Sequence, residues 1–198
     1  MRGLFNFIVS PDGERYNNSV KVGDKDLILN TEIFNHQHVN RNAIVLKTPA
    51  YTDSKIMEGD KVVVHHNVFR RWHDVKGVEK NSRSFMSEDE YIISDDQIFL
   101  HKTKDSDDWS ATDGFCFVQP LKSTKDFDVD TEEPLMGVVK YTDGVHEKGT
   151  LVGFTPVSKY EFVIGGKRLY RVMNKFITMT YDYRGKEEEY NPSWAQSC

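Results

Sequence analysis

The chain has 198 residues, 29% of them charged, and a formal net charge of −5. This acidic balance disfavours nucleic acid as a partner, because nucleic-acid-binding proteins usually carry a basic patch. No apolar run approaches the roughly eighteen residues of a membrane-spanning helix, and the first residues lack the apolar core of a signal peptide, so we expect a cytoplasmic protein with no membrane partner.

Strand patterns follow one another along the chain, and helical periodicity is nearly absent. Short runs of Val, Ile, Phe, Leu and Tyr are separated by Gly, Pro and Asn clusters, at the spacing of an all-β barrel or sandwich. In the first half these runs are residues 7–9, 43–46, 61–64, 90–93 and 97–99. The sequence therefore predicts an all-β fold.

A long polar loop, residues 11–37, separates the first two of these runs. Three consecutive aliphatic residues, Leu27, Ile28 and Leu29, interrupt its polar sequence. Exposed aliphatic residues in such a loop mark either an added strand or a docking element. The sequence leaves both interpretations open, because residues 20–29 could also form a hairpin that turns at residues 23 and 24.

A charge-dense segment, residues 103–112, is followed by a second set of strand patterns that repeats the first in order. The spacing between matched positions falls from 110 to 94, 90 and 79 for the pairs Phe7 and Phe117, Ala43 and Gly137, Gly59 and Gly149, and Ile98 and Ile177. Each decrease is a loop that is shorter in the second copy, and the first removes about sixteen residues. We therefore expect a first barrel over residues 1–102, a linker over 103–112 and a second, shorter barrel over 113–183.

Two features of the second copy lead to further expectations. Gly165 and Gly166 are typical of a tight hairpin turn, because glycine takes positive φ without a Cβ penalty. Residues 184–198 are polar and predict a loose tail. The alternative is that Tyr190, Pro192 and Trp194 anchor this tail against the barrel.

Taken together, these segments resemble the chaperonin-10 family, the GroES-type co-chaperonins. The features that carry the resemblance are a first strand, a loop with an aliphatic tripeptide, a Gly-Val-Val-like strand, a Gly-Asp-x-Val strand and a closing Tyr-Ile-Ile segment. In this chain they are Phe7-Ile8-Val9, Leu27-Ile28-Leu29, Ala43-Ile44-Val45-Leu46, Gly59-Asp60-Lys61-Val62 and Tyr91-Ile92-Ile93. The resemblance implies two tandem GroES-like β-barrels.

The chain departs from the family pattern in two places. Lys25 and Asp26 precede the aliphatic tripeptide where the family usually has two glycines. The second copy has no aliphatic triplet between Leu121 and Met136. Such divergence is typical of a phage-like member of the family.

The resemblance implies a co-chaperonin that binds a GroEL-type chaperonin ring and assists protein folding. Leu27, Ile28 and Leu29 would dock in an apolar groove of the ring, and Phe69 or Trp72 would face the folding chamber. Burying three aliphatic side chains stabilises docking by about 1.5–3 kcal/mol each, but ordering the loop costs about 1–2 kcal/mol per residue. One loop binds weakly, so we expect a homo-oligomer, paired through barrel edges, that presents several loops together.

Two binding alternatives remain at this point. A GroES-fold structural or interaction module, of viral origin, would keep the barrels without binding a chaperonin. Phe69 and Trp72, beside Arg70 and Arg71, could instead stack the bases of a single strand in an OB-like barrel, although the negative net charge counts against this.

Sequence patterns that would indicate metal binding or catalysis are weak. His36 and His38 would share one face of a strand, and His65, His66 and His73 follow, but no Cys or Glu at ligand spacing completes a metal site. No nucleotide-binding or nucleophile motif is present. We expect no enzyme activity, no catalytic residue, no metal and no cofactor.

Overall fold

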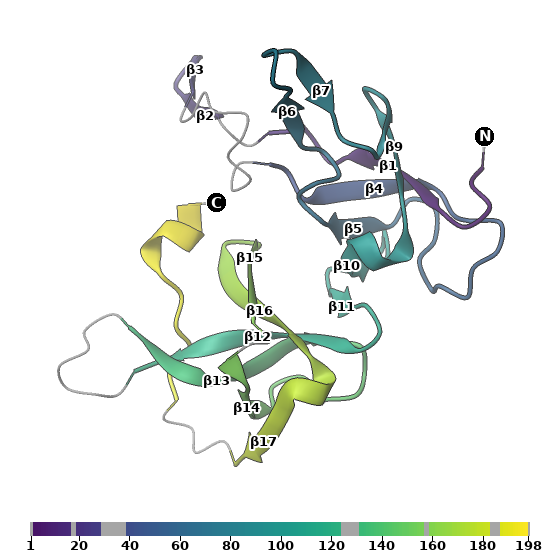
Figure 1. The fold of residues 1–198 in the computed structure, drawn as a ribbon. Helices are drawn as coiled ribbons and strands as arrows, with labels where there is room; N and C mark the ends of the chain where they lie inside the picture. The colour runs from purple at the N-terminus through teal and green to yellow at the C-terminus, as the bar shows by residue number, and fades with distance from the viewer. Residues whose placement is uncertain are drawn as a thin grey trace. The chain divides into compact units, whose positions relative to one another are not determined.

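A computed structural model describes residues 2–16, 19–28, 39–123, 131–156, 159–182 and 187–197. The protein is all-β, as the sequence predicts, and the described helical segments are short 3-10 turns (Figure 1). In these ranges no helix has the length and hydropathy to cross a membrane. The chain divides into two compact units, Met1–Trp109 and Ser110–Cys198, at a point inside the expected linker.

The first unit contains one larger antiparallel sheet and two separate hairpins. The sheet runs in the order β11-β10-β5-β4-β1-β9-β8, where β11 (Ser110–Ala111) follows directly on the first unit in sequence, while β2 pairs with β3 and β6 pairs with β7. A 3-10 turn, η2 (Asp95–Gln97), joins β9 to β10. The strands are β1 (Phe7–Pro11), β2 (Ser19–Val22), β3 (Lys25–Ile28), β4 (Asn42–Lys47), β5 (Lys61–Val64), β6 (Arg71–His73), β7 (Glu79–Asn81), β8 (Phe85–Ser87), β9 (Glu90–Ile93) and β10 (Ile98–Lys102).

The second unit contains an antiparallel sheet in the order β17-β14-β13-β12-β16-β15. The turn between β15 and β16 is formed by Gly165 and Gly166, both at positive φ, which confirms the predicted hairpin turn. Its elements are β11 (Ser110–Ala111), β12 (Phe115–Lys122), β13 (Glu132–Thr142), β14 (Leu151–Phe154), β15 (Tyr160–Ile164), β16 (Lys167–Met173), η4 (Asn174–Phe176), β17 (Ile177–Tyr181) and η5 (Ser193–Ser197).

The two sheets share one strand order. Replacing each strand of the row β10-β5-β4-β1-β9-β8 by its match in the second copy gives the row β17-β14-β13-β12-β16-β15. The irregularities coincide as well, because the register shift between Ile8 and Val9 recurs between Phe117 and Val118. The two rows therefore follow the same pairing pattern, and in the described strands each row runs from one edge to another without closing on itself.

The strand pairing corrects the match of the first strands by one residue. Val9 lies opposite the tyrosine of β9, and Val118 lies opposite the tyrosine of β16. Val9 therefore matches Val118, and Phe7 matches Cys116 at a spacing of 109; the match of Phe7 with Phe117 is wrong. The slip matters because it would move every side chain to the opposite face of the sheet, whereas Phe7 and Cys116 both fill their unit's core.

The described part of the tail, residues 187–197, packs on the second unit. Its backbone adds to the end of β12, where Lys122 N donates to Glu188 O at 2.8 Å and Tyr190 N donates to Pro120 O at 2.8 Å. Farther on, Pro192 and Ala195 are buried. The expectation of a loose tail is wrong for these residues, and the anchoring alternative holds.

Candidate functional site

The loop that follows β1 leaves the sheet through a closed neck. Tyr16 and Val39 face each other in an antiparallel bridge. Both side chains are buried in the first core, which also contains Phe7 and Val9. The bridge holds the two ends of the segment 17–38 together, so the loop closes on itself before it leaves the core.

Asn40 seals this neck with hydrogen bonds. Its buried side chain donates from Nδ2 to Glu14 O at 2.8 Å and to Asp12 O at 3.1 Å. Its Oδ1 accepts from Asn42 N at 2.9 Å, and its backbone N–H donates to Arg15 O at 2.9 Å. One side chain thus satisfies three backbone groups that the loop would otherwise leave without partners.

Inside the loop, β2 and β3 form the hairpin that the sequence left as one alternative. Val20 lies opposite Leu27 and Ser19 lies opposite Ile28, and the turn uses Gly23 at φ +64°. No other described strand joins this two-stranded sheet. Such an isolated hairpin is only marginally stable in water. Leu27 and Ile28 lie on β3, while Leu29 lies outside the described residues.

A second hairpin, β6–β7, lies in the first unit and has no counterpart among the described residues of the second unit. In the second unit the segment 155–159 joins β14 to β15 without described strands of its own. The β6–β7 turn is closed by Asp74, whose Oδ1 accepts from Lys76 N at 2.9 Å and from Val78 N at 3.0 Å. The bond from Val78 is the main cause that lowers the pKa of Asp74. Trp72 is 45% exposed on this hairpin and Val75 is fully exposed.

The neck and the β6–β7 hairpin are bonded to each other. The Tyr16 hydroxyl accepts from Arg71 N at 2.7 Å, and the Arg71 guanidinium lies 5.0 Å from the Tyr16 ring centroid. Arg15 Nη2 donates to Phe69 O at 3.1 Å and to Asn81 Oδ1 at 3.0 Å. The loop that contains β2–β3 and the hairpin β6–β7 are therefore held together at their bases by hydrogen bonds of Arg15 and Tyr16.

The two aromatic residues proposed to face a chamber lie in different environments. Phe69 is fully buried and meets the Tyr91 ring edge to face at 4.7 Å between centroids. Burial also raises the pKa of the Tyr91 hydroxyl. Phe69 therefore fills the core, and Trp72 is the aromatic side chain of this pair that reaches the surface.

The corresponding loop of the second unit is short, because β12 and β13 stay paired as far as Lys122 and Glu132. The backbone of Ser123 then donates to Thr131 O at 2.8 Å. Residues 124–130, which fill the rest of this loop, lie outside the described residues. The pairing leaves a far smaller insertion here than in the first unit.

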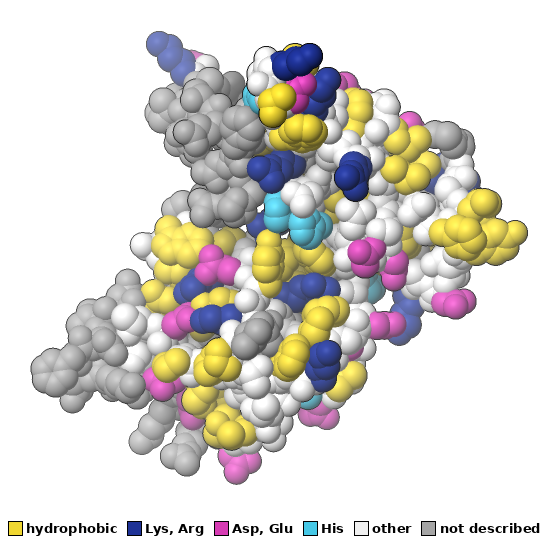
Figure 2. Space-filling view, in the orientation of Figure 1, with side chains coloured by type: hydrophobic (Ala, Val, Ile, Leu, Met, Phe, Trp, Pro, Cys, Tyr) yellow, Lys and Arg dark blue, Asp and Glu magenta, His cyan; other side chains and the backbone are white. Residues whose placement is uncertain are grey.

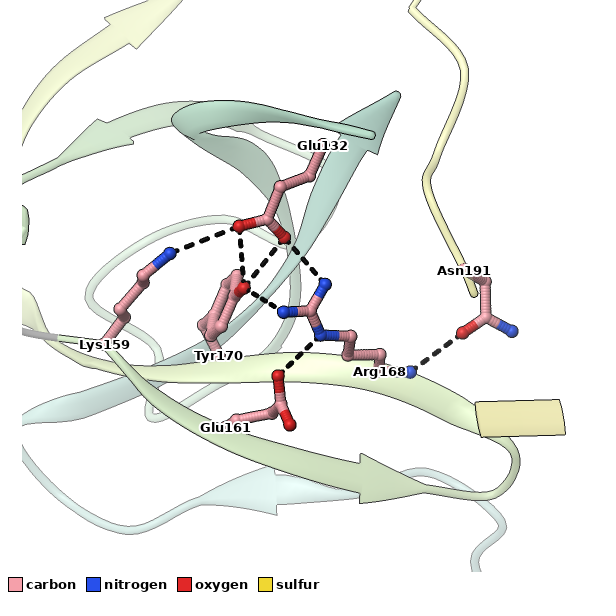
Figure 3. Close-up of polar contacts among 6 residues, drawn as sticks. All are labelled: Glu132, Lys159, Glu161, Arg168, Tyr170 and Asn191. Carbon is pink, nitrogen blue, oxygen red and sulfur yellow. Dashed lines mark hydrogen bonds and ion pairs between the residues drawn. The ribbon is translucent and has the colours of Figure 1, made fainter. Parts of the chain in front are cut away.

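An ionic cluster occupies the base of this short loop (Figure 3). Glu132 accepts from Lys159 Nζ at 3.2 Å, from Arg168 Nη1 at 2.9 Å and from the Tyr170 hydroxyl at 2.8 Å. Arg168 Nε also donates to Glu161 at 2.7 Å. Burial, reinforced by Glu132, raises the pKa of the Tyr170 hydroxyl, so it stays protonated and donates. The charged and polar groups of the cluster bond to one another, so we interpret the cluster as holding these segments together and not as a ligand site.

Sequence reasoning missed this cluster, because its members come from β13, β15, β16 and the segment before β15, with no spacing that links them. The histidines considered as metal ligands give no support for a metal site. His36 and His38 lie outside the described residues, and within the described residues no group of three or more His, Cys, Asp or Glu side chains could hold an ion. Comparison with family models, curated proteins and solved structures finds no match to this chain.

Proposed function

We propose that this protein is a cytoplasmic, co-chaperonin-like protein that binds a chaperonin ring through the loop of its first unit and assists protein folding. The observation that supports this most is the aliphatic segment on β3, set in a hairpin that pairs only with itself among the described strands and leaves the sheet through a closed neck. A partner that pairs with this hairpin would not have to separate it from another described strand.

Energetics favour docking by a self-contained loop. The bridge between Tyr16 and Val39 already joins the two ends of the loop, and each loop residue that binding fixes costs about 1–2 kcal/mol. Burying Leu27, Ile28 and Leu29 offsets this by about 1.5–3 kcal/mol per side chain. The three side chains together contribute about 4.5–9 kcal/mol, which the cost of fixing more than a few residues outweighs. One loop therefore binds weakly, and the proposal includes a homo-oligomer in which several loops bind one ring and raise the overall affinity.

The proposed fold behind this function is a tandem pair of GroES-like barrels. Its support is the shared strand order, the shared register shifts and the separate core of each unit. Among the described residues this hairpin loop occurs in the first unit, so the proposal gives each chain one docking element.

A second candidate is a GroES-fold interaction module that does not bind a chaperonin. The observation that favours it is the second unit, where the ionic cluster around Glu132 fixes the base of a short loop. If the first unit had also lost docking, its β6–β7 hairpin with the exposed Trp72 would be the remaining interaction surface.

The two candidates are separated by replacing Leu27, Ile28 and Leu29 together with Ser. We expect the variant to lose capture on an immobilised GroEL-type ring in the presence of nucleotide. Its melting temperature should stay close to that of the parent chain, because the loop lies beyond the neck.

The matched control replaces Val75 and Val78 with Ser on the other hairpin, where both side chains are exposed, and should bind like the parent chain. Unchanged capture of the triple variant would refute docking through β3. Absence of capture of the parent chain would favour the interaction module.

A further inference from the structure

The tail of the second unit fills a strand position between β12 and β16. β12 pairs with β16 from Phe115 to Val118 and no farther, while β13 pairs with the other side of β12 as far as Lys122. The tail takes the position that β16 leaves open, where Leu121 and Glu189 face each other in an antiparallel bridge. Figure 1 shows the tail, in yellow, passing β12 before it reaches η5. We call this strand position, between residues 120–122 of β12 and 166–168 of the β15–β16 hairpin, the slot.

Along the β12 wall of the slot, the tail behaves as an added strand. Lys122 N donates to Glu188 O, and Tyr190 N donates to Pro120 O, each at 2.8 Å. Main-chain bonds of this kind join an extended peptide to the edge of a sheet and provide affinity, while side chains provide specificity. Lys122 Nζ also lies 3.5 Å from the Glu188 carboxylate, which favours an acidic side chain at this position.

Along the other wall, one side chain of the tail takes the place of a strand. Asn191 Oδ1 accepts from Arg168 N at 3.0 Å (Figure 3), and Asn191 Nδ2 donates to Gly166 O at 2.9 Å. An amide side chain carries an acceptor and a donor together, whereas ionised aspartate has no donor and alanine has neither. This position therefore selects asparagine. Pro192 and Ala195, which follow it, are buried.

The walls of the slot are held by contacts that do not involve the tail. Glu132 of β13 bonds to Arg168 and Tyr170 of β16, and β16 pairs with β15 from Lys167 to Arg171. The slot should therefore keep its shape when it is empty, and a preformed site lowers the cost of binding. Figure 2 shows hydrophobic side chains mixed with charged ones over this unit, so hydrogen bonding along the slot is the more specific means of recognition.

From this arrangement we infer that the slot is a peptide-binding site and that the tail is its built-in competitor. The ligand is an extended segment of another protein that places an acidic residue three positions before an Asn-Pro pair, as Glu188 precedes Asn191 and Pro192. Because the tail belongs to the same chain, it is present at an effective concentration on the order of millimolar. A ligand has to displace the tail in order to bind. The inference goes beyond the proposed function, because the slot lies in the second unit and needs no chaperonin ring.

The test adds a labelled peptide with the sequence of residues 187–197 to full-length chains and follows binding by fluorescence anisotropy. Asn191→Ala removes the two side-chain hydrogen bonds of the tail, so the tail of this variant competes less. We expect this variant to bind the peptide about tenfold more tightly than the parent chain does. Ser193→Ala, at an exposed position of the tail, is the matched control and should bind the peptide as weakly as the parent chain.

Hydrogen exchange locates the bound peptide. The amides of Lys122 and Arg168 bond to the tail, so they should exchange faster in Asn191→Ala than in the parent chain, and the peptide should restore their protection. A peptide with alanine in place of its asparagine should not restore it. Tyr190→Pro, which removes the amide that bonds to Pro120 O, serves as a second variant with the same expected result, and circular dichroism verifies that each variant is folded.

The inference is overturned if the peptide binds the parent chain and both variants equally, if it binds none of them, or if the alanine peptide binds as well. Unchanged protection of both amides in the two variants would show that the tail is not displaced, which also overturns it. A parent chain that runs at twice its 23.0 kDa, and returns to that mass when the peptide is added, would assign the slot to the tail of a second copy instead. Because no chaperonin is present, these outcomes are independent of the loop-docking experiment.

Discussion

Asp143 joins three separate segments of the second unit. Its Oδ2 accepts from Gly114 N at 2.7 Å and from Asn174 Nδ2 at 2.8 Å, and its Oδ1 accepts from Val145 N at 3.0 Å. Burial raises the pKa of this carboxyl, but the hydrogen bonds from Val145, Gly114 and Asn174 outweigh burial and hold the pKa below its ordinary value of 3.8. The ionised form is therefore the one that stabilises the fold.

Replacing Asp143 with Ala should lower the free energy of unfolding at pH 7 by about 1–2 kcal/mol, the low end for a charged acceptor because the site is partly exposed. A depressed folded-state pKa contributes stability above the unfolded pKa, and this contribution is lost as the pH falls through the folded pKa. Urea denaturation along a pH series measures the free energy of unfolding of the parent chain and of the Asp143→Ala variant. A difference that persists unchanged well below pH 3.8 would contradict the assignment.

Single residues also show where sequence reasoning succeeds. Gly165 and Gly166 were predictable because positive φ restricts the choice of residue. Matching Phe7 to Phe117 failed, because two similar side chains in adjacent register positions look alike in sequence and only the cross-strand partners distinguish them. Phe69 lies in the same polar-aromatic segment as Trp72, and the sequence does not say which of the two rings is buried.

At the scale of elements, the neck determines what the loop can do. Asn40 holds it through groups on the backbone of Asp12, Glu14 and Asn42. Because these backbone groups bond to a side chain and not to a neighbouring strand, the neck should depend strongly on this one residue.

Asn40→Ala should lower the free energy of unfolding by about 1–3 kcal/mol, because it leaves buried polar groups without partners. The amide of Asn42 should also exchange with solvent faster, as measured by hydrogen exchange. The control is Asn67→Ala at an exposed position, which should leave both quantities unchanged. Full stability of the Asn40 variant would mean that the bridge between Tyr16 and Val39 alone closes the neck.

The strands that the sequence predicted and the strands that it missed are stabilised by different interactions. Strands such as β4, β5 and β9 were found because they bury Val, Ile and Tyr side chains against a core. The strand β7 is entirely exposed and reads Glu-Lys-Asn. It is stabilised by its turn and by contacts with the neck, and neither leaves a hydrophobic pattern that a sequence can reveal.

At the scale of the whole molecule, each unit has its own core. Phe69 belongs to the first one, and Phe→Ala at a buried site costs about 3–5 kcal/mol. Phe69→Ala should therefore raise hydrogen exchange in β1, β4, β5 and β9 while β12, β13 and β16 keep their protection. Val75→Ala, at an exposed position, is the matched control. Equal loss of protection in both units would show that they unfold as one.

The relative lengths of the loops were the feature best predicted from the sequence. The falling spacing between matched positions predicted the long first loop and the shorter second one, because insertions collect where strands end. The cluster of Glu132, Lys159, Arg168 and Tyr170 remained hidden, since it forms only when distant segments fold onto one another.

The shared strand order also creates a hazard while the chain folds. Each unit offers a strand of the other unit a place with the same direction and register. During folding, β4 could therefore pair with β12 in the place of β13. Multidomain and repeat proteins are prone to such misassembly. Gly137 opposes this exchange. A Cβ at its position would overlap the backbone oxygen of Gln119, and the matching residue of β4 is Ala43. One missing methyl group thus helps to keep β4 out of the place of β13.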